Sequence, residues 1–124
     1  MSVRFLIACC LLASVACSNQ PTAPSVVVTP IQIDSVDVLL LESFPVRAMA
    51  HVEGVVGDGC STLLPVETSR SGNVVTLSIL RERPAEAVCT LIAQLYDERI
   101  PLGEFPSGEY LLRVNDKETP FTVD

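Results

Sequence analysis

Apolar and polar residues alternate with a period of two through most of the chain beyond residue 35. The clearest stretch is 74–81, in which Val75, Leu77 and Ile79 share one face. A period of two sends successive side chains to opposite faces of a β-strand, whereas an amphipathic helix needs a period near 3.6. The alternation therefore predicts an all-β protein whose strands each bury one face.

Turn signals rich in Gly, Pro, Asn and Ser divide this pattern into about seven short strands. Residues 85–96 contain good helix formers, but β-branched Thr90 and Ile92 favour a strand there. No segment suits a crossover helix, so the pattern favours an antiparallel β-sandwich in which two sheets share one core. The expected strands are 35–41, 46–53, 60–68, 74–81, 88–96, 110–114 and 119–123.

The first 17 residues have the anatomy of an export signal. A basic start containing Arg4 precedes an uncharged run of 12 residues, 5–16, and a polar segment rich in Ser, Thr and Pro follows Cys17. The run ends in Ser14-Val-Ala-Cys17, which resembles a bacterial lipobox with Ser14 in place of the usual Leu. The resemblance implies cleavage after Ala16 and attachment of lipid to Cys17.

Two other interpretations of this segment remain open. It could be an ordinary secretory signal that leaves Cys17 as a spare thiol, or an uncleaved anchor, although its run falls short of the ~20 residues of a membrane span. The lipobox reading predicts a signal peptide over 1–16, a Pro-containing tether over 17–30 and a β-sandwich domain over 31–124. It places the protein on the extracytoplasmic face of the bacterial envelope, and Ser18 permits sorting to an outer membrane.

Two cysteines, Cys60 and Cys89, remain after the signal peptide and Cys17 are set aside. An even pair in an exported domain predicts one disulfide, with two free buried thiols as the alternative. No cysteine or histidine spacing is typical of a metal site, and no cofactor is expected.

The chain from residue 17 onward carries seven Lys and Arg against 15 Asp and Glu, a net charge of −8. Such a balance argues against nucleic acid as a partner. A domain of this size seldom holds a deep cleft, so no small-molecule substrate is predicted. The lone His51 lies mid-strand without a nucleophile motif around it, so the chain is not expected to be an enzyme.

Residues 106–114, Pro-Ser-Gly-Glu-Tyr-Leu-Leu-Arg-Val, resemble the closing strand of secreted immunoglobulin-like modules. Together with Asp58-Gly-Cys60, residues 83–90 and Ile100-Pro-Leu102, they resemble uncharacterised sandwich modules of bacterial envelope proteins. The resemblance implies an immunoglobulin-like β-sandwich with one disulfide. It brings no catalytic residues with it, because architecture does not specify function.

The expected function is that of a membrane-anchored binding or structural module of the envelope. Its partners would be the membrane, through the lipid, and a protein or polymer outside the cell. Arg81 and Arg83, in a charged connection over 81–86, are the candidate binding loop, with a solvated turn as the competing interpretation. An inhibitor of extracellular enzymes and a small accessory subunit of an envelope enzyme are the alternative functions.

Overall fold

The computed structural model describes Cys17 and residues 25–124, so the expected signal peptide over 1–16 lies outside the described residues. The described part is all-β, as predicted, and none of its residues form a helix long and apolar enough to cross a membrane. Its ten strands are β1 (Val26–Pro30), β2 (Gln32–Leu41), β3 (Val46–Gly57), β4 (Thr62–Leu63), β5 (Glu67–Ser71), β6 (Val74–Ser78), β7 (Leu80–Pro84), β8 (Gln94–Phe105), β9 (Gly108–Val114) and β10 (Lys117–Val123).

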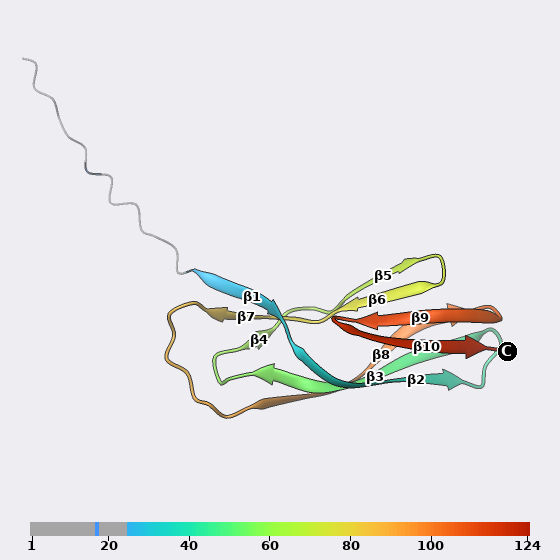
Figure 1. Ribbon diagram of the computed structural model, residues 1–124, viewed down its shortest axis with the longest axis horizontal. Helices are drawn as coiled ribbons and strands as arrows, with labels where there is room; N and C mark the ends of the chain where they lie inside the picture. Colours follow the sequence, from blue (N-terminus) through green and yellow to red (C-terminus); the bar gives the residue numbers. More distant parts are fainter. Residues whose placement is uncertain (1–16, 18–24) are drawn as a thin grey trace, which may run out of the picture.

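The strands form three sheets in an elongated molecule, and the two larger sheets lie against each other in the half that holds the C-terminus (Figure 1). Two larger sheets, β10-β9-β6-β5 and β2-β3-β8, share the core of the sandwich. A small sheet, β1-β7-β4, lies at the opposite end of the molecule from the C-terminus (Figure 1). Strand pairs are antiparallel throughout, except that β6 and β9 run parallel.

The core takes its side chains from alternate positions of both larger sheets, as a period of two requires. Phe105, Tyr110 and Phe121 close one end of it, with ring centroids 5.0–5.4 Å apart. The Tyr110 hydroxyl donates a hydrogen bond to the Pro106 carbonyl at 2.7 Å, which satisfies its polar end. The other buried apolar residues are Ile31, Ile33, Ala48, Ala50, Val52, Val56, Val75, Leu77, Ile79, Tyr96, Leu112, Val114 and Val123.

The chain changes sheets at two buried isoleucines, and one asparagine side chain joins the crossings. Ile31 connects β1 to β2 and Ile79 connects β6 to β7, and the Ile31 amide donates to the Ile79 carbonyl at 3.1 Å. Asn115 Nδ2 donates to both isoleucine carbonyls, at 3.1 and 3.0 Å, and its Oδ1 accepts from the Ile79 amide at 2.9 Å. The side-chain amide therefore replaces the ladder bonds that the sheets lose there.

The domain begins earlier than the sequence predicted. Residues 26–30, expected in the tether, form β1, which pairs with β7 in the register Val26 to Pro84 through Pro30 to Leu80. Residues 81–86 were expected to form a charged connection, but Arg81 and Arg83 lie in β7. Three consecutive valines in β1 supply the β-branched residues that favour this pairing.

The predicted strand over 88–96 is wrong for most of its length. Residues 85–93 form an irregular loop, and β8 starts at Gln94 and continues through 97–103, which had been predicted as a connection. The alternation of apolar residues gave a misleading signal, because Leu91 is 95% exposed. Pro101 does not end β8, since this strand pairs only with β3 among the described strands and is an edge of its sheet.

Two further boundaries differ from the expectation. The strand predicted over 60–68 is divided at Pro65 into β4 and β5, which belong to different sheets. Gly54 and Gly57, expected in a connection, lie inside β3. A Cβ at Gly54 would collide with the carbonyl oxygen of Gln32, so close packing of the backbones explains this glycine.

Candidate functional site

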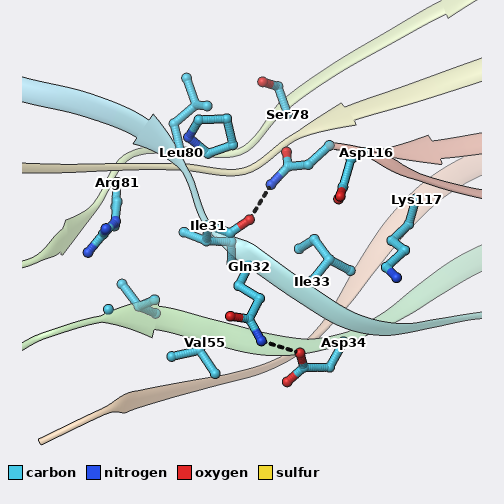
Figure 2. A pocket seen from close by; sticks show the side chains of 14 residues that line it. Ile31, Gln32, Ile33, Asp34, Val55, Ser78, Leu80, Arg81, Asp116 and Lys117 are labelled. Atoms are coloured by element: carbon cyan, nitrogen blue, oxygen red, sulfur yellow. Dashed lines mark hydrogen bonds between the residues drawn. The ribbon is translucent and has the colours of Figure 1, made fainter.

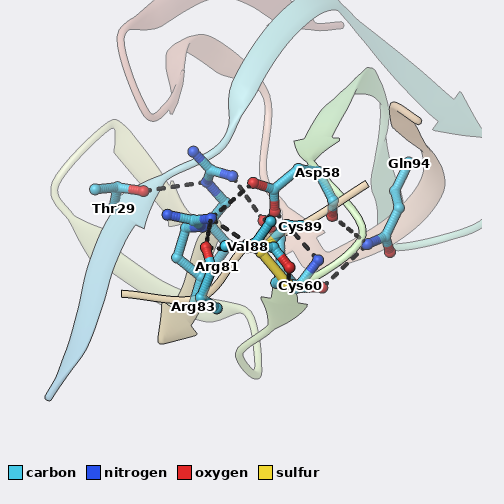
Figure 3. A network of polar contacts seen from close by, with 10 residues as sticks. Thr29, Asp58, Cys60, Arg81, Arg83, Val88, Cys89 and Gln94 are labelled. Atoms are coloured by element: carbon cyan, nitrogen blue, oxygen red, sulfur yellow. Dashed lines mark hydrogen bonds and ion pairs between the residues drawn. A yellow bond between two sulfur atoms is a disulfide. The ribbon is translucent and has the colours of Figure 1, made fainter. Parts of the chain in front are cut away.

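A disulfide joins Cys60 to Cys89, as predicted, and it lies beside Asp58 and Arg83 (Figure 3). Cys60 follows the end of β3, and Cys89 lies in the middle of the loop 85–93. The Gly59 amide donates to the Thr90 carbonyl at 3.1 Å, beside the disulfide. Gln94, where β8 starts, donates through Nε2 to the Ser61 carbonyl at 3.2 Å and also to that of Asp58. The loop is therefore held at its middle and at its end.

The candidate binding residues Arg81 and Arg83 are engaged inside the protein, which corrects their placement in an exposed loop. Arg83 Nη2 lies 3.0 Å from Asp58 Oδ2 in an ion pair whose side chains are mostly buried. Arg81 donates through Nη1 to the Ser61 hydroxyl at 2.7 Å and through Nε to the Thr29 hydroxyl at 3.2 Å. Both guanidinium groups therefore fix the segment after β3 against β7 (Figure 3).

Asp58 is the acceptor that organises this network. Its Oδ1 accepts from the Cys60 amide at 3.2 Å and from the Ser61 hydroxyl at 3.0 Å. Partial burial opposes ionisation of the carboxyl, but the bonds from Ser61 and Cys60 and the charge of Arg83 outweigh it. They hold the pKa of Asp58 below its ordinary value.

Asp58 should make stability depend on pH in the acid range. Since its folded pKa lies below the ordinary value of 3.8, the folded state releases this proton more readily than the unfolded state. Its contribution is present above that value and is lost as the pH falls through the folded pKa. We expect Asp58→Asn to flatten the acid limb of the unfolding free energy, measured by urea denaturation between about pH 5 and 2. An Asp37→Asn control on the exposed part of β2 should retain the wild-type slope, and parallel curves for Asp58→Asn and wild type would contradict the account.

The loop 85–93 and the start of β8 carry the most exposed large aliphatic side chains of the described residues. Val88 is 101% exposed, Leu91 95%, Ile92 75% and Leu95 80%. We call these four residues the apolar tip. Their pattern of branched and aliphatic residues was visible in the sequence, but it indicated a buried strand, and only the fold shows that these side chains face solvent.

An open groove of about 970 Å³ lies where the chain crosses between sheets (Figure 2). Its walls come from the β1–β2 crossing, the end of β3 and the β9–β10 turn. The polar groups in it largely satisfy one another: Gln32 Nε2 donates to Asp34 Oδ1 at 2.7 Å, and Asn115 bonds the two isoleucines described above. The polar groups that line the groove therefore hold the strands together, and the described residues do not bring a set of reacting groups together in it.

The outer face of the β2-β3-β8 sheet carries His51 beside two carboxylates. His51 Nε2 lies 2.7 Å from Asp97 Oδ1 and 3.9 Å from Glu53 Oε1, and the three possible ligand atoms lie within 4.8 Å of one another. Ser35 donates its hydroxyl to Glu53 at 2.9 Å. This arrangement does not place a serine hydroxyl on the imidazole, as nucleophilic catalysis by a Ser-His-Asp set requires.

Cys17, the predicted lipidation site, is exposed and is the free cysteine of the described residues. The other candidate residues gather at one end of the domain. Two segments, 57–63 and 80–95, contain the disulfide, the ion pair between Arg83 and Asp58, and the apolar tip.

The family model of the ORF11 beta-sandwich domain matches residues 50–123. The chain belongs to the ORF11 beta-sandwich domain family. The match includes the disulfide, Asp58 and the apolar tip, and it leaves β1 and Cys17 outside.

Relatives of this ORF11 beta-sandwich protein occur in Herpetosiphon aurantiacus. An uncharacterised 10.2 kDa protein in the HgiCIIM 5′ region is 31% identical over 85 residues, which cover 68% of this chain and 90% of the relative. An uncharacterised 10.2 kDa protein in the HgiBIM 5′ region is 28% identical over 75 residues, or 60% of this chain and 92% of the relative. No solved structure matches the chain.

Proposed function

We propose that this protein is a lipid-anchored module of the bacterial envelope that acts by binding outside the cell rather than by catalysis. The observation that carries the proposal is the different state of its cysteines. Cys60 and Cys89 pair with each other, whereas Cys17, at the end of the apolar run, is exposed and free. A structural disulfide is typical of an oxidising compartment, and a free cysteine directly after an export signal supports attachment of lipid.

The non-catalytic part of the proposal is supported by how the polar side chains are used. Arg81, Arg83 and Asp58 bond one another or their neighbours, and Asn115 holds the sheet crossings together. His51 is paired with Asp97 on an open sheet face, where water is not excluded. These groups are arranged to rigidify a scaffold that presents a surface.

Replacing Cys17 tests the anchor. Cells producing the full chain should hold the wild-type protein in the detergent-extractable membrane fraction, and Cys17→Ser should move it to the soluble extracytoplasmic fraction. The reason is that the lipid would be the main attachment to the bilayer, at ~0.8 kcal/mol for each buried methylene group.

Cys10→Ser provides the matched control for this test. It removes a thiol from the apolar run without touching the expected attachment site, so it should leave the protein in the membrane fraction. A Cys17→Ser protein that remains membrane-bound to the wild-type extent would refute lipid anchoring at this residue.

Inhibition of an extracellular enzyme is the second candidate, and one observation favours it. The loop that carries the apolar tip is exposed and braced by the disulfide, so it could enter an enzyme's cleft without much loss of conformational entropy. Under this function the tip would contact an enzyme, and the enzyme would cover the exposed side chains of the tip.

A further inference from the structure

We propose that the apolar tip, Val88, Leu91, Ile92 and Leu95, is a second membrane contact, which enters the interfacial region of the bilayer that holds the Cys17 lipid. This inference rests on the proposed lipid anchor. It adds a defined orientation: the small sheet faces the membrane, and the sandwich points away from it.

The first support is the position of the tip relative to the anchored end of the chain. The loop 85–93 runs along the end of the molecule at which β1 begins (Figure 1). Its first residue, Ala85, donates its amide to the carbonyl of Ser25, the residue before β1, at 3.0 Å. The loop is therefore joined directly to the segment that leads from Cys17 into β1. Eight residue steps separate Ser25 from Cys17, and a fully extended chain of that length reaches at most about 29 Å. The tip therefore stays near the bilayer surface once Cys17 is lipidated.

The second support is the way in which the tip is presented. Its four aliphatic side chains are 75–101% exposed. The disulfide at Cys89 and the Thr90 bond to Gly59 hold the loop in this form, so these side chains do not fold back onto the core. Such a concentration of exposed apolar groups on a small domain marks an interaction surface. Half-exposed Val26 and Val28 on β1 extend apolar character at the same end.

The charge of the surroundings decides between kinds of lipid contact. Arg83 is neutralised by Asp58, Glu86 in the loop is exposed, and the chain from Cys17 onward has a net charge of −8. Anionic headgroups would be repelled rather than attracted. The contact is therefore hydrophobic, and it should form on phosphatidylcholine, which carries no net charge, and be insensitive to salt.

The absence of tryptophan from the chain makes a direct test available. Leu91→Trp places a single fluorophore in the tip, and Phe44→Trp places one in the β2–β3 connection, at the opposite end of β3 (Figure 1). Phe44 is 103% exposed, so the two probes start from matched solvent exposure. β3 has 12 residues, so its length separates the ends by about 36 Å.

Mature protein bearing either substitution is reconstituted in phosphatidylcholine vesicles containing lipids brominated near the top of the acyl chains. A side chain that enters the interface by about 5–10 Å lies beside these bromines, so Leu91→Trp should lose roughly half of its emission. Phe44→Trp should keep its emission. Ile92→Trp repeats the measurement in the event that Leu91→Trp does not fold.

The state of Cys17 is read separately, from the mass of the protein used. If Cys17 carries no lipid, the proposed anchor fails, and the same variants are attached through the Cys17 thiol to a maleimide lipid, so that the tip is still tested. Unquenched emission from Leu91→Trp and Ile92→Trp on membrane-attached protein would overturn the proposal, as would equal quenching of Phe44→Trp. A tip that is shielded only by an added extracellular enzyme would overturn it in favour of inhibition.

Discussion

Replacing both Cys60 and Cys89 with alanine should lower the free energy of unfolding by about 3–4 kcal/mol. The two residues are 29 positions apart, so the disulfide closes a loop of about 30 residues and removes many conformations from the unfolded chain. A domain of this size has a total stability of only about 5–15 kcal/mol, so the loss is large. Urea denaturation of the double variant against wild type measures it directly.

Reduction of the wild-type protein supplies the control. Reduced wild type should unfold near the midpoint of the double alanine variant, because both lack the same covalent constraint. The loop 85–93 should also gain hydrogen exchange in both, since Cys89 lies at its middle. A change in unfolding free energy below about 1 kcal/mol would show that noncovalent bonds hold this end without the disulfide.

Asn115→Ala should cost about 3 kcal/mol of unfolding free energy. The side-chain amide makes three hydrogen bonds to the main chain of Ile31 and Ile79, both of which are buried. Its removal leaves two carbonyls and one amide without that partner, at about 1 kcal/mol each. Alanine also fits poorly at Asn115, whose φ is 51°.

Two further variants separate these effects. Asn115→Gly accepts the positive φ but loses the side-chain bonds, so it should recover only the backbone strain and remain clearly destabilised. Asn115→Asp keeps an acceptor for the Ile79 amide but places a carboxylate against the two carbonyls, which should also destabilise the fold. If Asn115→Gly unfolds within about 0.5 kcal/mol of wild type, the side-chain bonds do not hold the crossings.

The parts of the fold that the sequence predicted are those in which alternation coincides with burial. Val75 and Leu77 in β6, and Tyr110, Leu112 and Val114 in β9, alternate and are buried. The expected strands 110–114 and 119–123 leave a turn between them, and Asn115 in that turn has a positive φ, which asparagine tolerates. The role of its side chain was not predictable, because its partners Ile31 and Ile79 are distant in sequence.

The predictions for the misassigned segments were wrong for a common physical reason. In the loop 85–93 the apolar residues alternate as in a strand, yet they face solvent, and periodicity carries no information about what lies opposite a side chain. In β8 the charged residues 97–99 lie on an edge strand that needs little apolar cover. A sequence pattern reports the period of a segment but not its place in the sheet.

In the candidate site, too, one feature was predictable from the sequence and another was not. Pairing of Cys60 with Cys89 followed from the cysteine count and is confirmed. Arg81 and Arg83 were expected in an exposed connection, as a binding loop or a solvated turn, but Asp58 and Ser61, 20 or more residues earlier, engage them. An ion pair between residues so far apart depends on β7 returning beside the end of β3, which only the assembled sheets provide.

The mass of the N-terminal peptide of protein extracted from bacterial membranes tests the central proposal most directly. Lipid anchoring predicts that this peptide begins at Cys17 and carries acyl chains, with Cys60 and Cys89 joined in the same preparation. A peptide that begins at or near Cys17 with an unmodified thiol, or one that retains residues 1–16, would contradict the account.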